Sequence, residues 1–481
     1  MKREGDKVAL KQMLKAAMIC AAMVSFEGYK VMSEAEDMRA VDTIVHGRYV
    51  VTMDGVQDVI EHGAVAVQDG AIVAVGTADE ITASYAASEI ISGDNRVLMP
   101  GFVNGHTHSA MVLFRGMADD LALMTWLQEY IFPMEGRYVD PAFIEVGSEL
   151  ACWEMIQGGT TSFVDMYFYP EVIARVVDRC GLRAVISAPM IDFPSPGFKG
   201  WDDSFKAGVE FVEAWKGKHS RITPALAPHA PYTVSKEHLV QVTAKAKELD
   251  VPISIHIAED KAEVKTVSDK YGITSIELMS EVGMTDVTTV AAHVVWPRES
   301  DIKALASSKV GAIHNPTSNL KTAAGIAPIP AMLEAGVKVG LGTDGAASNN
   351  DLDMWEELRL AALLHKGNGG DPTVVPARAA LKMATVGGAE AVGLGDVTGS
   401  LSVGKRADMI QVSLDSLRLS PLYDVMSQLV YAAGARDVVT TIVDGKVLMA
   451  DGKVLTVDEA VLRQKVQAVA DKIRADLAVK K

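Results

Sequence analysis

Two histidines separated by one residue, His106 and His108, end the segment Pro-Gly-Phe-Val-Asn-Gly-His-Thr-His, which begins at Pro100. In an extended strand, side chains at positions i and i+2 point to the same face. The two imidazoles can therefore converge on one point at the end of a strand, which suits a first-row metal such as zinc. Such a pair also occurs by chance in loops, so a metal site requires further ligands elsewhere in the chain.

Other apolar runs of the chain also end in a histidine or an aspartate. A lone histidine at a strand end is most often a structural residue, but many strands of one sheet ending in this way would bring their side chains to one place. That many unpaired buried polar groups would be costly without a metal or a substrate. Besides the first pair, the residues at these positions are Asp165, His229, His256, His293, His314 and Asp344.

Two carboxylates near these positions suit different roles. Glu259 follows His256 by three residues, so it could reach the site as a proton donor rather than as a ligand; the alternative is a solvated acid at a helix start. Asp344 lies in Gly-Leu-Gly-Thr-Asp-Gly, where the alternative is a turn aspartate. Three neutral histidines and one carboxylate leave a position open for water, and a metal held in this way lowers the pKa of that water to about 7.

The middle of the chain alternates apolar runs with helix-like stretches, which is the pattern of βαβ units in a parallel sheet. Eight such units predict a (β/α)8 barrel, with its active site at the C-terminal ends of the strands. The alternative is an open doubly wound sheet, but no glycine-rich phosphate loop follows the first strand. The expected strands are Gly101–Gly105, Thr160–Asp165, Leu182–Ala188, Ile222–Pro228, Val251–His256, Thr288–His293, Val310–His314 and Val337–Asp344.

Short strands rich in valine and isoleucine flank the barrel on both sides. They lie in residues 40–98 and 394–455 and are separated by Asp-Gly turns. We therefore expect one small β-sandwich built from both ends of the chain, around a barrel of residues 99–393. A helix-like patch, Asp79–Ser88, interrupts the first set of strands.

The composition indicates a globular protein with a large core, because 49% of its 481 residues are hydrophobic and 22% are charged. The formal net charge of -16 argues against nucleic acid or an anionic membrane surface as the main partner. The three cysteines show no metal or disulfide spacing, so a reducing, cytoplasmic compartment is expected.

The two ends of the chain are expected to lie outside these domains. Residues 1–39 form an N-terminal extension in which basic residues precede an uncharged run, Ala16–Phe26. This resembles a signal peptide and leaves export open, but no clear small-x-small cleavage site follows; the alternatives are an amphipathic extension or an upstream start codon ahead of Met38. At the other end, residues 456–481 are expected to form a final helix, with Thr456 placed to cap its start.

The eight βα units and their polar residues resemble the amidohydrolase superfamily over roughly residues 40–455. The motifs that carry the resemblance are His106-Thr-His108, His256-x-x-Glu259, His293, Gly-Thr-Asp344 and the tail segment Gly404-Lys-Arg-Ala-Asp408. The resemblance implies one divalent metal per subunit, of which zinc is the default and iron(II) and manganese(II) fit the same ligands. Because His229 ends the fourth strand and no lysine is there to carry a bridging carbamate, a mononuclear site is implied. The implied ligands are His106, His108, His256 and Asp344.

Within this superfamily the chain is most similar to the S-adenosylhomocysteine/5′-methylthioadenosine deaminases. By that resemblance Trp126 would line the nucleoside pocket, Glu135 would accept hydrogen bonds from the ribose hydroxyls, and His229 would contact the purine side of the substrate. The alternatives are a packed aromatic for Trp126 and a surface acid for Glu135. The matching stretches include residues 106–116, 227–232, 314–321 and 342–350.

The resemblance implies hydrolytic deamination of a 6-aminopurine nucleoside (5′-methylthioadenosine, adenosine or S-adenosylhomocysteine) to the inosine analogue and ammonia. Asp344 would take a proton from the attacking water and deliver it to the amine, Glu259 would protonate ring nitrogen N1, and His293 would hydrogen-bond the attacking oxygen. The alternatives are a hydrolase of another heterocycle, of the guanine deaminase or triazine hydrolase type, and a non-catalytic relative. The expected partner is a small nucleoside, with no nucleic acid or membrane, and a homodimer or higher homo-oligomer follows from family habit.

One segment departs from the pattern expected of members that act on S-adenosylhomocysteine. Such members are expected to hold the amino-acid carboxylate with arginines near and after strand three, but residues 187–201 contain no arginine. Phe193, Phe198 and Trp201 would instead suit an apolar 5′ group, as in 5′-methylthioadenosine. Lys199 could compensate for the missing arginines.

Overall fold

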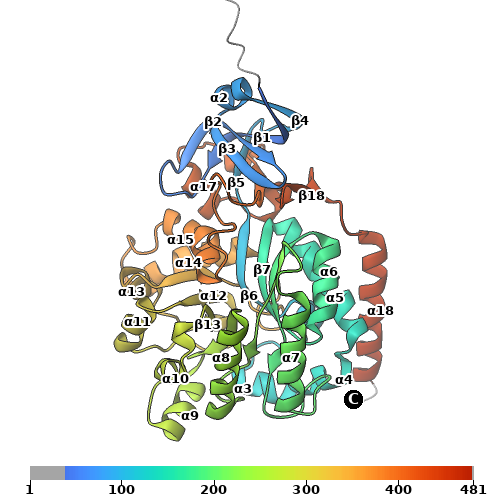
Figure 1. Cartoon of the computed structure of the whole chain (residues 1–481), viewed down its shortest axis with the longest axis vertical. Helices are drawn as coiled ribbons and strands as arrows, with labels where there is room; N and C mark the ends of the chain where they lie inside the picture. The colour runs from blue at the N-terminus through green and yellow to red at the C-terminus, as the bar shows by residue number, and fades with distance from the viewer. Residues whose placement is uncertain (1–37, 479–481) are drawn as a thin grey trace, which may run out of the picture.

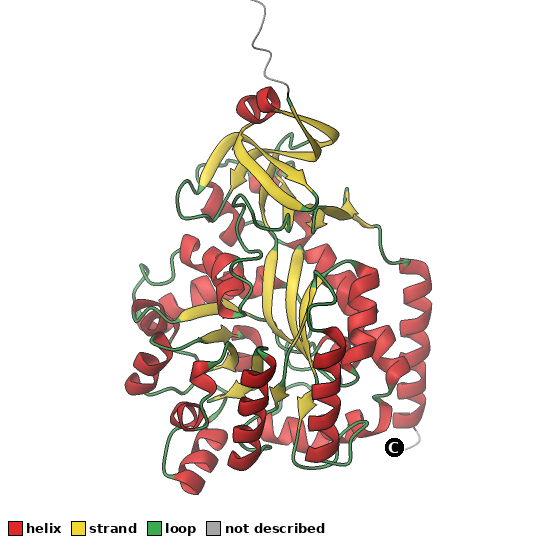
Figure 2. Cartoon of the chain, viewed as in Figure 1, coloured by secondary structure: helices red, strands yellow, loops and turns green. Residues whose placement is uncertain are grey.

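The structure is a computed structural model that describes residues 38–478, and its centre is the expected (β/α)8 barrel (Figures 1 and 2). The barrel strands are β6 (Phe102–Thr107), β7 (Thr160–Met166), β8 (Arg183–Ser187), β10 (Ile222–Pro224), β12 (Ile253–Ile257), β13 (Thr289–His293), β14 (Val310–His314) and β15 (Lys338–Leu341). They form two parallel sets, β6 to β10 and β12 to β15. The sets meet where Ser254 N donates to Leu226 O at 3.0 Å and, on the other side, where Asp344 N donates to His106 O at 2.9 Å. These contacts close the barrel.

The fourth strand differs from the continuous strand that we expected. It ends as β10 at Pro224 and resumes as β11 (Ala227–Pro228). Each piece ends in a proline, which has no N–H to donate to a ladder, so the strand cannot pair without interruption. β11 pairs instead with a short strand, β9 (Pro189–Met190), beyond the end of β8. The break brings His229, directly after β11, to the C-terminal mouth of the barrel.

Helices surround the barrel wall, as Figure 2 shows. The first of them ends at a glycine with a left-handed backbone, Gly159 (φ 81°), which leads directly into β7. The helices of the barrel are α5 (Pro141–Gly158), α6 (Pro170–Cys180), α7 (Trp201–Trp215), α8 (Lys236–Leu249), α9 (Lys261–Tyr271), α10 (Ser275–Glu281), α11 (Glu299–Ala306), α12 (Pro316–Lys321), α13 (Ile329–Glu334), α14 (Met354–Gly369), α15 (Ala377–Ala384) and α16 (Val386–Ala391).

The small domain is assembled from both ends of the chain, as predicted, and its strands are hydrogen-bonded as one nine-stranded sheet. From the N-terminal part come β1 (Arg39–Val51), β2 (Val59–Gln68), β3 (Ala71–Thr77), β4 (Tyr85–Ile91) and β5 (Arg96–Pro100). From the C-terminal part come β16 (Met409–Ser413), β17 (Val438–Val443), β18 (Lys446–Ala450) and β19 (Lys453–Val454). The two parts join where β5 runs antiparallel to β16.

Two local predictions in the flanking segments were wrong. The helix-like patch is only half helical, because α2 (Ala78–Ser84) gives way at Tyr85 to β4, which pairs with β1. The final helix, α18 (Glu459–Ala478), is capped by Asp458, whose Oδ1 accepts from Val461 N at 3.1 Å. Thr456 instead donates to the carbonyl of Cys180 at 2.9 Å.

The signal-like segment expected near the N-terminus lies in residues 1–37, outside the described residues. Between residues 38 and 478, no helix is both long and apolar enough to cross a membrane.

A buried ion pair joins the barrel to the small sheet. Arg183 at the start of β8 is 2% exposed and contacts both carboxylate oxygens of Asp408, at 2.6 and 3.1 Å. Its guanidinium also lies 3.4 Å from Asp444 Oδ1 and donates to Ser220 O at 2.9 Å. Asp408 Oδ1 in turn accepts from the backbone N–H of Asp444 at 2.8 Å. Asp408 ends the Gly-Lys-Arg-Ala-Asp motif, so this motif ties the two domains together.

Removing one partner should therefore destabilise the protein more than removing a surface charge. Asp408→Ala leaves a buried guanidinium largely uncompensated, and we expect a loss of about 3 kcal/mol or more in the free energy of unfolding. Glu459→Ala, which breaks the exposed pair between Glu459 and Arg463 (2.6 Å), should cost less than about 1 kcal/mol. Urea unfolding of the two variants checks this, and equal midpoints would contradict it.

Candidate active site

The four residues expected to bind the metal lie together at the C-terminal mouth of the barrel. His106 is in β6 and His108 directly follows it; the Nε2 atoms of these residues lie 3.4 and 3.3 Å from Asp344 Oδ1. His256 in β12 places its Nε2 3.2 Å from that of His108. The ligand atoms of His106, His256 and His293 also lie within 4.8 Å of one another. One ion placed among these atoms would reach ligands from opposite sides of the barrel.

The imidazoles are oriented so that they can receive a metal. His108 Nδ1 lies 2.7 Å from the carbonyl of Met166, and His256 Nδ1 lies 2.7 Å from the carbonyl of His229. A carbonyl only accepts, so each Nδ1 carries the proton and each Nε2 lone pair faces the cluster. Within the described chain, both ring nitrogens of His106 are buried without a hydrogen-bond partner. This donor set fits a divalent metal, which prefers neutral imidazole and carboxylate ligands.

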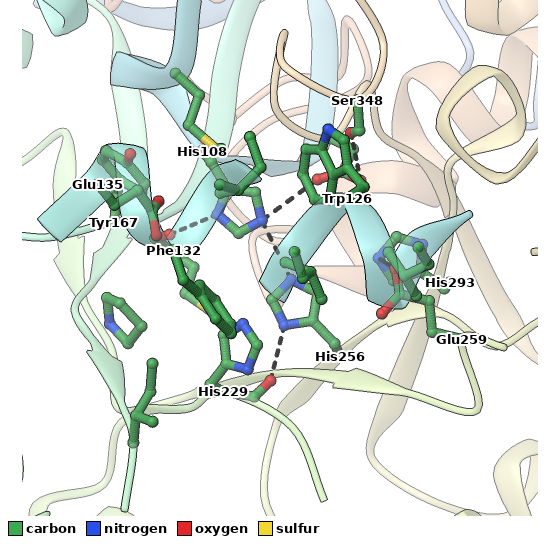
Figure 3. Close-up of a pocket in the computed structure, with 18 of the residues that line it drawn as sticks. His108, Trp126, Phe132, Glu135, Tyr167, His229, His256, Glu259, His293 and Ser348 are labelled. Carbon is green, nitrogen blue, oxygen red and sulfur yellow. Dashed lines mark hydrogen bonds and ion pairs between the residues drawn. The ribbon is translucent and has the colours of Figure 1, made fainter. Parts of the chain in front are cut away.

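The next two residues of the predicted machinery lie beside this cluster. His293 ends β13 with a left-handed backbone (φ 76°), and its Nδ1 lies 2.8 Å from Asn319 Oδ1. Its Nε2 lies 3.6 Å from Glu259 Oε1. The side chains of Glu259 and His293 therefore lie next to each other on one side of the pocket, as Figure 3 shows.

Burial and neighbouring charges push the two acids of the site in opposite directions. Burial, with the charges of Asp344 and Asp260, raises the pKa of Glu259 well above its ordinary value. Burial alone would raise the pKa of Asp344 too, but contact with His106 and the charges of the nearby imidazoles lower it well below its usual range. One carboxyl is thus disposed to keep its proton while the other is disposed to lose it.

The Asp344 carboxylate is also held by hydroxyl groups from α12 and from the turn that follows β15. Its Oδ2 accepts from Ser318 at 2.7 Å and from Ser348 at 3.1 Å, which leaves Oδ1 facing the histidines. The buried Glu357 hydrogen-bonds both of the segments that carry these serines. Its carboxylate accepts from Thr317 N at 3.2 Å and from Asn349 Nδ2 at 2.7 Å.

Two of the strand-end residues play structural parts. Asp165 accepts from Ser109 N at 2.6 Å, Ser109 Oγ at 2.9 Å and Thr107 Oγ1 at 2.9 Å, so it holds the backbone on both sides of His108. His314 packs outward, with its Nε2 3.3 Å from that of His365 in α14. Neither residue lines the cavity of the site.

A pocket leads from the cluster of histidines and Asp344 to residues 123–138, which cover the mouth of the barrel. This covering segment consists of α3 (Leu123–Thr125), the π-helical turn η2 (Trp126–Ile131) and α4 (Phe132–Tyr138). Trp126, Glu135 and His229 all line this pocket, as expected (Figure 3). The Trp126 indole N–H is buried and has no acceptor among the described residues. Burial raises the pKa of Glu135 to about 7. The apolar wall is formed by Leu123, Leu127, Ile131, Phe132, Phe168 and Ile191.

The aromatic residues expected around a 5′ group do not line the pocket. Trp201 instead starts α7, where its ring stacks on His238 with a centroid distance of 4.2 Å. Phe132, Phe168 and Tyr167 supply the aromatic surface in place of the expected residues. The position of the last two, just after β7, is a signal in the sequence that could have identified them, because residues that follow barrel strands face the mouth.

Comparisons with known proteins agree with this geometry. Residues 97–448 match the model of the amidohydrolase family, and residues 63–87 match an imidazolonepropionase-like composite domain of bacteria. A 5′-deoxyadenosine deaminase of Methanosarcina acetivorans is 46% identical over 85% of this chain and 93% of its own length. A 5-methylthioadenosine/S-adenosylhomocysteine deaminase of Thermodesulfovibrio yellowstonii is 43% identical over 84% and 92%.

Among solved structures, an adenosine deaminase of Xanthomonas campestris with bound zinc has a TM-score of 0.89 and 39% identity, covering 91% of this chain and all of its own. A triazine hydrolase of Arthrobacter, at 24% identity and a TM-score of 0.82, covers 89% of this chain and 99% of its own and shares the fold.

This chain belongs to the amidohydrolase family, and the predicted resemblance and barrel fold are confirmed. Among these relatives, the chain is most similar to the proteins named as nucleoside deaminases. The expected domain boundaries and the homo-oligomer remain predictions.

The ligand set can be tested by metal content. We expect His256→Asn and Asp344→Asn to weaken binding of zinc by more than about 100-fold, since losing even an outer partner of a ligand typically costs 10- to 100-fold. His229→Asn is a matched control, because His256 hydrogen-bonds the backbone carbonyl of His229, which the substitution keeps, and not its side chain. Dialysis against a chelator followed by elemental analysis measures this. Equal retention in all three variants would contradict the proposed ligands.

Proposed function

We propose that this protein is a zinc-dependent deaminase of 6-aminopurine nucleosides that carry a small uncharged 5′ group, such as 5′-methylthioadenosine or 5′-deoxyadenosine. The observation that carries this proposal is a single pocket with the His/Asp cluster and Glu259 at one end, and a buried carboxylate within an apolar wall at the other. Relatives named as deaminases of such nucleosides, and a zinc-containing adenosine deaminase structure, support it.

The pocket offers complementary contacts to each part of such a nucleoside. Trp126 and His229 present flat rings to a purine, and the Trp126 N–H is available to an acceptor on the base. Glu135, buried in the covering segment, suits the two ribose hydroxyls, because a carboxylate accepts hydrogen bonds through both oxygens. The aliphatic wall suits an apolar 5′ group.

His106, His108, His256 and Asp344 would hold a divalent ion, which would act as a Lewis acid and make the attacking water more acidic near neutral pH. Asp344, which its lowered pKa keeps ionised, accepts a proton from the attacking water and later gives it to the departing amine. The water oxygen becomes the C6 carbonyl oxygen of the product, and the amine leaves as ammonia.

Glu259 and His293 act on the base and on the attacking oxygen. Glu259 has a raised pKa and holds a proton that it donates to N1 as the bond to C6 forms. When the amine leaves, the C6 hydroxyl group becomes the carbonyl and returns its proton to the Glu259 carboxylate, which restores the acid. His293 Nε2 is buried without a hydrogen-bond partner in residues 38–478, so it is free to hydrogen-bond the attacking oxygen. Asn319 keeps the ring in that orientation through Nδ1.

The charges of the pocket disfavour a substrate with an amino-acid tail. None of the described residues that line it is a lysine or an arginine, and Lys199, the cation that could have compensated, is exposed and lies outside it. The carboxylate of S-adenosylhomocysteine would therefore be desolvated without a cationic partner. A methylthio group or a bare 5′ carbon carries no such penalty.

Replacing the proton donor should remove catalysis and spare binding. We expect Glu259→Gln to lower kcat by roughly 10²- to 10⁴-fold, the usual contribution of a general acid, with little change in KM. The variant should retain its zinc, because Glu259 is outside the proposed ligand set. Steady-state ammonia release together with metal analysis checks this; substantial turnover by the metal-loaded variant would remove Glu259 from the mechanism.

The substrate class is tested by ammonia release from five compounds given in parallel: 5′-methylthioadenosine, 5′-deoxyadenosine, adenosine, S-adenosylhomocysteine and guanine. We expect kcat/KM for the first two to exceed that for S-adenosylhomocysteine by at least about tenfold, since losing a charge-assisted pair costs about 1.5–3 kcal/mol. Activity on guanine alone would contradict a nucleoside pocket. Equal use of S-adenosylhomocysteine would contradict the argument from charge.

A further inference from the structure

Glu263 is a buried acid close to the proton donor that the reaction steps above leave without a role. It lies in the first turn of α9, four residues after Glu259, and is 2% exposed. Its side chain is not part of the pocket wall. A carboxylate this deeply buried must be paired with hydrogen-bond donors, so its partners indicate what it is for.

The partners of Glu263 are the backbone N–H groups that carry the proton donor. Its Oε1 accepts from Ala258 N at 2.8 Å and from Ser275 Oγ at 2.9 Å. Its Oε2 accepts from Glu259 N at 2.7 Å. The two oxygens of one side chain therefore grip two successive peptide units, and Ser275 at the start of α10 fixes the side chain from behind.

These contacts hold a turn that would not form readily by itself. Ala258 has a left-handed backbone (φ 50°), which an alanine rarely adopts. The other side of the same residue is held as well, because its carbonyl accepts from Val295 N at 2.9 Å and Trp296 N at 3.0 Å. The path from the proposed ligand His256 to Glu259 is thus fixed on both faces.

Ordinary helix capping does not account for the arrangement. Asp260 is the N-cap of α9 and accepts from Glu263 N at 2.7 Å. In a capping box the acid at the third helical position would bond the N–H of the capping residue itself. Asp301 in α11 does this, accepting from Arg298 N at 2.8 Å. Glu263 instead bonds the two residues that precede the cap.

We propose that Glu263 is a positioning residue for the proton donor: it fixes the turn at Ala258 and Glu259 so that the Glu259 carboxyl faces His293 and the substrate nitrogen. This rests on the proposed deaminase function. The residue touches neither substrate nor metal, and its effect on the reaction passes entirely through Glu259.

The test is a double-mutant cycle with 5′-methylthioadenosine as substrate. Glu263→Gln keeps the size of the side chain but turns an N–H group toward a backbone donor, and we expect kcat to fall roughly 10- to 100-fold because a small misplacement of a catalytic group is enough for such a loss. KM and zinc content should stay near those of the wild type. In the Glu259→Gln background the same change should lower kcat by no more than about threefold, since residues that act as a unit are not additive.

Asp301→Asn is the matched control, because Asp301 is a buried acid at the same helical position whose partners, Arg298 N and Thr274 Oγ1, do not line the pocket. It should leave kcat unchanged. If Glu263→Gln fails to fold, Ser275→Ala takes its place in the test. This milder change removes one hydrogen-bond donor from Glu263 and should also lower kcat. A crystal structure of the Glu263→Gln protein should show the Glu259 carboxyl displaced from His293.

The outcomes separate the two proposals. A Glu263→Gln protein as active as the control, effects on kcat that multiply in the double variant, or an undisplaced Glu259 would overturn the role of Glu263. In those cases an inactive Glu259→Gln protein would leave the deaminase standing. Full turnover by Glu259→Gln would remove Glu259 from the mechanism, and no turnover by the wild type would overturn the proposed function itself. In either case the crystal structure would still decide whether Glu263 positions residue 259.

Discussion

Ionisable side chains cannot be buried without partners, and this constraint organises the mouth of the barrel. Imidazoles from β6, β12 and β13 and the carboxylate of Asp344 lie within a few ångströms of one another, all of them largely buried. Outside the metal position, most of their remaining polar atoms are paired with carbonyls, hydroxyls and an asparagine. Among the described residues, both ring nitrogens of His106 and Nε2 of His293 stay without a hydrogen-bond partner. They belong to the same cluster, where an ion and a substrate would supply the missing interactions.

The same constraint explains how the segments that carry the site residues are held. Asp165 and Glu263 are buried acids that accept hydrogen bonds from Ser109 N beside His108 and from Glu259 N. Glu357 accepts them from Thr317 and Asn349, the neighbours of the two serines that contact Asp344. Each acid comes from the element next to the loop that it holds. The strands alone would not fix the side chains that follow them. The geometry of the site therefore depends on these three buried carboxylates as well as on the barrel.

Much of this arrangement follows from the sequence because its signals are local and repeated. The eight strands end within a few residues of where their apolar runs stop, and the residues after them meet at one mouth. Features that depend on contacts between residues far apart in the sequence were harder to predict. Pro224 and Pro228 split a strand that hydrophobicity alone would continue, and Asp458 caps the last helix because Thr456 is engaged by Cys180. The apolar wall comes mostly from residues 123–138, whose relation to the barrel mouth no periodicity reveals.

The antiparallel pairing of β5 with β16 sets an order of events for a chain made from its N-terminus. Val97 pairs with Val412, so the edge of β5 has no partner until 412 - 97 = 315 further residues have been synthesised. At 5–20 residues per second, that takes roughly 15 to 60 s. During this interval β5 presents an open, apolar edge, the kind of surface that recruits wrong partners. The small sheet is completed only after the barrel residues have been synthesised.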